Sequence, residues 1–283
     1  MAMRKESSGS RSRFVTLVAL TFLVGGCSPS ETETASEEHN AVHWGYEAAN
    51  GPDHWGSMDP EWALCAEGRE QSPIDLANAS LGELSSLELR RVSAMEVDRL
   101  NQDGVISLVD NGHSIQINAK TGETLTIGGK SYALLQFHFH APSEHTRDGQ
   151  YFPMEIHFVH QAEDGALAVV GVFVEEGAEN PGIAPLWGHL PDASETETTV
   201  QIPAGFADHI FSGDPTGAYH YRGSLTTPPC SEGVTWIFRA TPTQFSTGQI
   251  VAFTAIYDHN NRPVQALNAR PLYLDESPTV TIR

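Results

Sequence analysis

The chain has 283 residues, 40% of them hydrophobic, and its 36 acidic and 16 basic residues give a formal net charge of −20. This excess of negative charge argues against nucleic acid as a partner and against electrostatic docking on an anionic membrane. The length is compatible with one globular domain, because all-β and α/β chains of this size often fold as a single unit.

Residues 1–26 have the layout of a secretory signal, in which basic residues precede an apolar run, here Phe14–Val24. A run of about 11 residues is too short to span a bilayer as a helix. It ends in Val24-Gly25-Gly26-Cys27, which resembles a bacterial lipobox. We therefore predict a lipoprotein signal peptide over residues 1–26 and lipidation at Cys27. An ordinary cleaved signal with an incidental cysteine is the alternative.

A lipid anchor at Cys27 would place the protein on the periplasmic side of the envelope of a Gram-negative bacterium, and Ser28 favours sorting to the outer membrane. Residues 27–40 carry several glutamates among serines and threonines. Such a composition cannot bury a core, so this segment is predicted to be an acidic, flexible tether. The folded domain is expected over residues 41–283.

Strands dominate the prediction for this domain. Short runs rich in β-branched and aromatic residues favour strands, and Asp-Gly, Asn-Gly and Gly-Gly pairs between them suit tight antiparallel turns. Short, peripheral helices are expected over 181–190 and 242–257. The predicted strands are Val105–Val109, Ser114–Asn118, Thr124–Ile127, Ser131–His140, Met154–His160, Ala166–Val174 and Val234–Phe238.

The chain has three cysteines. If Cys27 is lipidated, only Cys65 and Cys230 remain in an oxidising compartment, which favours a disulfide between them. Two separate buried thiols are the alternative. A bridge would close a loop of roughly 165 residues and would stabilise the fold by about 5 kcal/mol in the chain-entropy model.

The sharpest motif is Gln136-Phe137-His138-Phe139-His140, because alternation along a strand places both histidines on one face. His157 lies on a second predicted strand, so the three imidazoles converge if the two strands are neighbours. A lone strand histidine is usually just hydrogen-bonded, but three without a fourth protein ligand are typical of catalytic Zn²⁺, whose open position holds water. We therefore predict that His138, His140 and His157 bind zinc.

Two polar residues share the faces of these histidines. Gln136 lies two residues before His138, and Glu155 lies two residues before His157. Each can accept the second imidazole N–H, which fixes the tautomer and raises the basicity of the ligand.

With these motifs the chain resembles the α-class carbonic anhydrases, in particular their bacterial periplasmic members. The resemblance implies one mostly β (α+β) domain with a large, mainly antiparallel central sheet, short peripheral helices, and a Cys65–Cys230 disulfide. The matching motifs are His43-Trp44-Gly45-Tyr46, Gly51-Pro52-Asp53-His54-Trp55, Gln71-Ser72-Pro73-Ile74-Asp75, Asn111-Gly112-His113, Gln136–His140, Ser143-Glu144-His145-Thr146, Glu155-Ile156-His157, Ser224-Leu225-Thr226-Thr227-Pro228-Pro229 and Asn261-Arg262-Pro263.

The family's activity is the reversible hydration of carbon dioxide to bicarbonate and a proton, by attack of a zinc-bound hydroxide. His138, His140 and His157 match its zinc ligands. Thr226 matches the hydroxyl that accepts a hydrogen bond from the hydroxide and donates one to Glu144. His113 matches the proton shuttle, a suitable role because imidazole titrates near neutral pH.

The resemblance also assigns the surroundings of the zinc. Thr227 matches the position that meets bicarbonate, and His145 matches a histidine beside Glu155. Three polar residues match positions that hold a chain of water molecules: Tyr46, Asn111 and Gln116. Six residues match the apolar wall that suits carbon dioxide: Val159, Leu167, Val169, Leu225, Val234 and Trp236.

The expected partners are carbon dioxide and bicarbonate, a membrane only through the lipid at Cys27, and no nucleic acid. Bacterial relatives are often dimers, so a homodimer is left open. Two other functions compete: a non-catalytic relative that binds a partner, and a zinc-binding surface lipoprotein. All three histidines are retained together with Thr226, Glu144 and His113, which favours the enzyme.

Overall fold

A computed structural model describes most of the predicted folded domain. The chain divides into two compact units, Met1–Ala41 and Val42–Arg283, and every described residue belongs to the second. The predicted signal peptide, Cys27 and the tether lie outside the described residues. No helix in the described part of the chain is both long and apolar enough to cross a membrane. The described residues are 42–81, 105–118, 124–127, 129–190, 197–201, 210 and 216–279.

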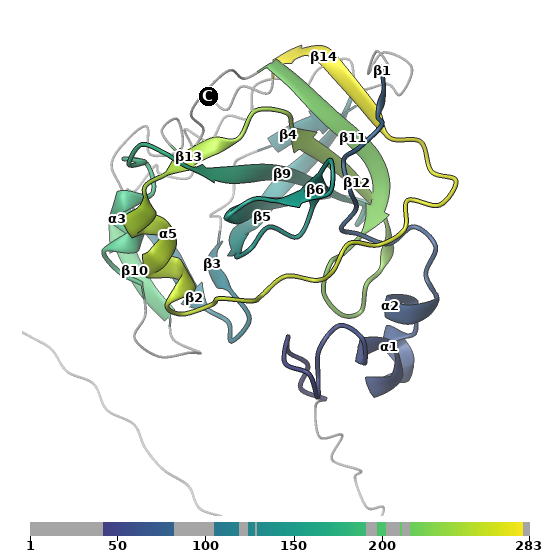
Figure 1. Cartoon of the computed structure of the whole chain (residues 1–283), viewed down its shortest axis with the longest axis horizontal. Helices are drawn as coiled ribbons and strands as arrows, with labels where there is room; N and C mark the ends of the chain where they lie inside the picture. Colours follow the sequence, from purple (N-terminus) through teal and green to yellow (C-terminus); the bar gives the residue numbers. More distant parts are fainter. Residues whose placement is uncertain are drawn as a thin grey trace, which may run out of the picture. The chain divides into compact units, whose positions relative to one another are not determined.

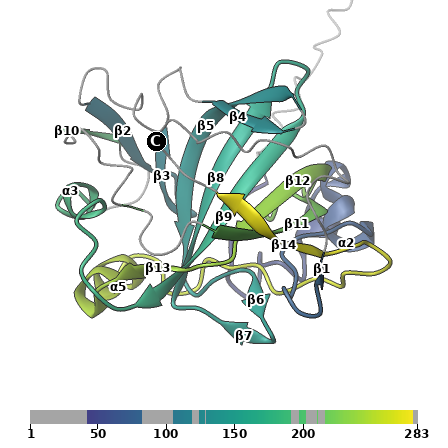
Figure 2. The same ribbon diagram turned by 90° about the horizontal axis from the view of Figure 1, so that it is seen from above.

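Within these ranges, one mixed sheet of twelve strands forms the body of the domain (Figures 1 and 2). Two of the twelve strands lie beside the main order of the other ten: β4 (Thr124–Ile127) pairs with β5 (Lys130–His140), and β13 (Thr243–Phe245) pairs with β9 (Leu167–Glu176). The main order is β1 (Ser80–Leu81), β14 (Tyr273–Thr279), β11 (Thr216–Ser224), β12 (Glu232–Arg239), β9 (Leu167–Glu176), β8 (Met154–Ala162), β5 (Lys130–His140), β3 (Ile115–Asn118), β2 (Val105–Asp110) and β10 (Glu197–Gln201).

The pairings described are antiparallel except for β1 with β14, β12 with β9 and β13 with β9. The predicted mainly antiparallel sheet is therefore confirmed, and each of the seven predicted strands is present. A separate hairpin joins β6 (Thr146–Arg147) to β7 (Gln150–Tyr151). Its turn residues, Asp148 and Gly149, have φ angles of 51° and 76°, a left-handed conformation that Asp-Gly pairs favour.

The helices are short. The predicted helix over 181–190 is present as α3 (Ala184–Trp187), but the prediction over 242–257 was wrong at its start. There, β13 pairs with β9, and α5 (Thr247–Thr254) begins only after a capping box between Ser246 and Gln249. Three short helices that were not predicted precede the sheet: α1 (Trp55–Met58), η1 (Pro60–Trp62) and α2 (Leu64–Glu67).

The two faces of the central strands differ in what they bury. Phe137 and Phe139 of β5 and Phe158 of β8 are fully buried in the larger hydrophobic cluster, where each contributes about 1.5–3 kcal/mol relative to an exposed side chain. Strand alternation then turns His138, His140 and His157 to the opposite face. The packing of the phenylalanines thus determines where the histidines lie.

Candidate metal centre

Strands β5 and β8 bring the three predicted ligands together. Their antiparallel register pairs His138 with His157 directly and places Glu155 opposite His140. One nitrogen of each histidine lies within 4.8 Å of one nitrogen of both others. The ring centroids are 4.9 Å apart for His138 and His140, 5.2 Å for His138 and His157, and 4.6 Å for His140 and His157.

Each predicted acceptor lies against its histidine. Nδ1 of His138 donates to Oε1 of Gln136 at 2.8 Å, and Nε2 of His157 donates to Oε1 of Glu155 at 2.5 Å. These bonds fix one nitrogen of each ring as the proton carrier. Nε2 of His138 and Nδ1 of His157 are left available as ligands.

The acceptor for the third histidine was not predicted. Nδ1 of His140 donates to the main-chain oxygen of Asn260 at 2.7 Å. Because any residue can present a main-chain carbonyl, the identity of Asn260 gave no signal for this contact. Its side chain holds the segment in place, since Nδ2 donates to the carbonyls of His113 and Phe139 and Oδ1 accepts from Ala141 N.

The remaining nitrogens fit a divalent metal ion. Nε2 of His140 is buried without a hydrogen-bond partner, a state that costs roughly 1–3 kcal/mol unless a ligand satisfies it. Burial, followed by the neighbouring imidazoles, lowers the pKa of His138 well below its ordinary value. Burial also lowers the pKa of His140, despite the opposing charge of Glu144. Both rings are therefore neutral at pH 7, which is the form that binds metal.

A second group with suitable spacing, His145, Glu155 and His157, is better explained by hydrogen bonds. Glu155 accepts from Nδ1 of His145 at 2.6 Å and from its main-chain N at 2.8 Å, and Nε2 of His145 contacts the Tyr221 hydroxyl at 2.6 Å. Burial alone would raise the pKa of Glu155, but His145 and His157 hold it well below its ordinary value. Glu155 is therefore an ionised acceptor for His157. Tyr221 was not predicted in this network.

Glu144 lies beside the ligand nitrogens. It is completely buried, and its Oε1 accepts the main-chain N–H of Arg262 at 2.8 Å. Its Oε2 has no hydrogen-bond partner and lies 3.6 Å from Nε2 of His140 and 3.9 Å from Nδ1 of His157. The hydrogen bonds of the described residues include none between Glu144 and Thr226, which is also buried.

The six residues predicted to form the apolar wall belong to one hydrophobic cluster. Val159, Val169 and Trp236 lie side by side across β8, β9 and β12, because Val169 pairs with the other two in register. The Trp236 ring lies 4.9 Å from that of His157, and its Nε1 donates to the carbonyl of Ser224, two residues before Thr226. Val234 is also buried in the cluster, and Leu167 and Leu225 pack partly buried against it.

His113 lies in the turn between β2 and β3. Its ring is half-buried and stacks on Trp44, with centroids 3.7 Å apart and planes 11° apart. Tyr46 packs edge-on against the same tryptophan. Nearby, Nδ2 of Asn111 donates to Oε1 of Gln116 at 3.2 Å, so these two predicted residues are in contact.

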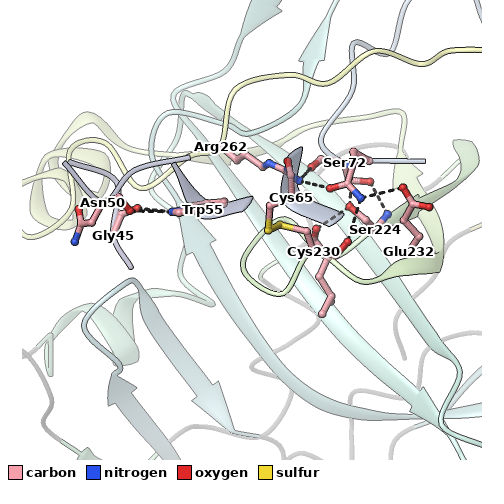
Figure 3. The surroundings of a disulfide bond; sticks show 11 residues. Gly45, Asn50, Trp55, Cys65, Ser72, Ser224, Cys230, Glu232 and Arg262 are labelled. Carbon is pink, nitrogen blue, oxygen red and sulfur yellow. Dashed lines mark hydrogen bonds between the residues drawn. A yellow bond between two sulfur atoms is a disulfide. The ribbon is translucent and has the colours of Figure 1, made fainter. Parts of the chain in front are cut away.

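A disulfide joins Cys65 of α2 to Cys230, as predicted (Figure 3). The main-chain N of Cys230 donates to the carbonyl of Thr227 at 2.8 Å. The bridge therefore ties α2 to the loop that carries Thr226 and Thr227. Both sulfur atoms lie within a small cluster that includes the buried ring of Trp55.

One glycine next to the site has no room for a side chain. Gly171 of β9 pairs directly with His157. A Cβ atom at this position would lie 2.4 Å from the ring of Phe238, which in turn lies 4.8 Å from the ring of His145. Sequence reasoning did not identify Gly171, because a glycine within a strand does not show what approaches it.

The chain is similar to known proteins over most of its length. The family model for eukaryotic-type carbonic anhydrase matches residues 50–276. A carbonic anhydrase of Pectobacterium atrosepticum is 40% identical over 234 residues, covering 82% of this chain and 90% of the relative. One from Nostoc sp. is 38% identical over 267 residues, covering 92% and 96%. The structure of the α-carbonic anhydrase from Thermovibrio ammonificans with the inhibitor sulfanilamide superposes with a TM-score of 0.74 at 39% identity, covering 82% of this chain and 99% of that one.

Proposed function

This chain belongs to the eukaryotic-type carbonic anhydrase family, whose reaction is the hydration of carbon dioxide. We propose that it catalyses this reaction with Zn²⁺ held by His138, His140 and His157. The observation that carries the proposal is the group of three converging nitrogens, one of them buried and without a partner. When bound, zinc supplies a water whose pKa is about 7, the established value for carbonic anhydrase, and thus a nucleophile at neutral pH.

In this proposal, Glu144 and Thr226 orient the reacting water. Oε2 of Glu144 is buried, unpartnered and within 4 Å of two ligand nitrogens. The Thr226 hydroxyl would donate its hydrogen to Oε2 of Glu144. The Thr226 oxygen would then have a lone pair left, which can accept a hydrogen bond from the O–H of the reacting water. Anions that have no hydrogen to donate to Thr226 would then bind poorly.

The apolar cluster around Val159, Val169 and Trp236 supports carbon dioxide as the substrate. A molecule without net charge or dipole loses little when it leaves water, whereas polar competitors lose their hydrogen bonds. Thr227 is proposed to meet the bicarbonate product. Tyr46, Asn111 and Gln116 are proposed to hold the water molecules that lead toward His113, which would pass the released proton to solvent.

Metal analysis of the purified protein, paired with stopped-flow measurement of hydration, tests the proposal. One zinc per chain and loss of activity on chelation, reversed by added zinc, are expected. His157→Ala should lose both metal and activity. The matched control is His160→Ala, which removes another buried histidine of β8, from the opposite face, and should retain zinc. A His157→Ala variant with full zinc and full activity would rule out the ligand assignment.

The same measurements separate the two competing functions. A non-catalytic relative that binds a partner would show no hydration at any zinc content. A zinc-binding surface lipoprotein would hold exchangeable metal and show no hydration either. The burial of His140 and His157 within the sheet favours a metal that exchanges slowly.

We also propose that the mature protein begins at Cys27 and is held at the periplasmic side of the envelope by lipid on that residue. The basis is the sequence Val24-Gly25-Gly26-Cys27 after an apolar run. Metabolic labelling with palmitate should mark the wild type and leave Cys27→Ser unlabelled. Equal labelling of both would contradict the anchor. Sedimentation of the soluble variant would show whether it is a homodimer.

A further inference from the structure

The segment from Asn260 to Arg262 contacts two groups of the proposed site. Asn260 accepts from Nδ1 of His140 through its main-chain oxygen, and Arg262 donates its main-chain N–H to Oε1 of Glu144. Side-chain bonds to the carbonyls of His113 and Phe139 already anchor Asn260. The contact with Glu144 instead depends on what holds Arg262.

The guanidinium of Arg262 supplies that anchor (Figure 3). Nη1 donates to Oε1 of Gln71 and to the carbonyl of Ser72, both at 2.8 Å, and Nη2 donates to the carbonyl of Cys65 at 2.7 Å. The same group lies 5.8 Å from the centroid of the Trp55 ring, within reach of a cation–π interaction. One side chain therefore ties the segment beside Glu144 to the region of the disulfide.

These contacts are more than a surface arginine would make. Arg262 is 1% exposed, and its acceptors are neutral oxygens rather than carboxylates. Burial lowers its pKa to about 10, against the opposing effect of Glu144, so the side chain stays charged at neutral pH. A buried charge without an ion-pair partner is costly unless hydrogen bonds compensate it.

We infer that Arg262 is a positioning residue for Glu144: its guanidinium fixes the main-chain N–H that holds Oε1, so that Oε2 stays directed toward the metal ligands. The inference rests on the proposed function. If Arg262 only stabilised the fold, its loss would not alter one property of the site selectively. As a positioning residue it controls the orientation of Glu144, and hence of the Thr226 hydroxyl, but not the retention of zinc by the histidines.

The affinity for an anion depends on that orientation. In the proposed active site, where Glu144 accepts from Thr226, the Thr226 hydroxyl would present only a lone pair and would disfavour azide. If the Glu144 carboxylate loses its fixed orientation, the Thr226 hydroxyl can donate to azide instead, so the affinity for azide should rise. This readout, taken by calorimetry on the zinc-loaded protein, does not require turnover.

The experiment compares Arg262→Met with Arg270→Met. Arg270 is also buried, and its guanidinium donates to main-chain carbonyls, including that of Gln71, but it makes no contact with Glu144 in the described structure. For Arg262→Met we expect about tenfold tighter azide binding and about tenfold lower kcat/KM, with zinc content unchanged. For Arg270→Met we expect both values within about twofold of the wild type, although its melting temperature should fall.

Arg262→Lys covers the case in which Arg262→Met does not fold. It keeps the buried charge but loses the several N–H donors of the guanidinium. Azide affinity should therefore rise and kcat/KM should fall, each by about threefold. Wild-type azide affinity in the folded Arg262 variants would overturn the inference, as would equal changes in Arg270→Met. A wild-type protein that binds zinc but does not hydrate carbon dioxide would instead overturn the proposed function.

Discussion

Oε1 of Glu155 lies 2.5 Å from Nε2 of His157 and also accepts from the ring of His145. The carboxylate therefore orients the ligand histidine while a second imidazole orients the carboxylate. Removing such a partner of a metal ligand typically costs 10–100-fold in metal affinity or activity.

Glu155→Ala should accordingly bind zinc about 10–100-fold more weakly, because the His157 ring loses its acceptor and its fixed tautomer. Competition with a chelator of known affinity measures the change. Glu175→Gln is the control, since Glu175 of β9 contacts Gln244 rather than a histidine. Zinc affinity in Glu155→Ala equal to that of the control would show that the contact does not support the metal.

Thr226→Ala should keep zinc but lose about 100-fold in hydration rate, the order expected for removing one preorganised hydrogen-bond partner. Affinity for azide should rise as well, because the Thr226 hydroxyl, which would disfavour anions that have no hydrogen to donate, is absent. Thr226→Ser retains a hydroxyl and should recover most of the rate. If alanine and serine behave alike, the hydroxyl has no part in the reaction.

His113→Ala should lower kcat at low buffer concentration and leave kcat/KM for carbon dioxide nearly unchanged. The reason is that the proton must leave after carbon dioxide has reacted, and an acceptor of matched pKa is needed for that step. Imidazole buffer at high concentration should restore much of the loss. His189→Ala, which removes an exposed imidazole after α3, is the control. Equal loss in kcat and kcat/KM, or no rescue by buffer, would remove His113 from proton transfer.

Acid should destabilise the fold through His160. This side chain is completely buried, and burial lowers its pKa to about 4. An unfolded chain takes up the proton near pH 6.5, so acidification from pH 7 to 5 favours unfolding by about 2 kcal/mol from this residue alone. Urea unfolding at both pH values should show a smaller loss for His160→Gln than for the wild type. An identical loss would show that His160 does not titrate in this range.

The sequence predicts those parts of the site that depend on the alternation of side chains along a strand. Phe137 and Phe139 alternate with His138 and His140, and burying the rings sends the imidazoles to the other face. The contacts of Gln136 and Glu155 follow from the same periodicity. The resemblance to a known family supplied the distant residues, such as Thr226, which no local pattern connects to the histidines.

Other parts could not be predicted, because the information lies in contacts distant in the sequence. Asn260 acts through its main-chain oxygen, which is the same for every residue type. Strand β13 occupies a segment predicted to be helical, because pairing with β9 outweighs local preference until the capping box at Ser246. Strand β14 carries Asp275, Glu276 and Pro278, residues that are rare in strands, so its place beside β11 was not predicted.

Gly171 limits which sequences can maintain this site. It lies opposite His157, and even one methyl group there would clash with the Phe238 ring, which packs against His145. A residue that would touch neither metal nor substrate is thus restricted by packing alone. In a library of single variants selected for activity, position 171 should tolerate almost no replacement. Mutational intolerance alone would then wrongly identify Gly171 as a catalytic residue.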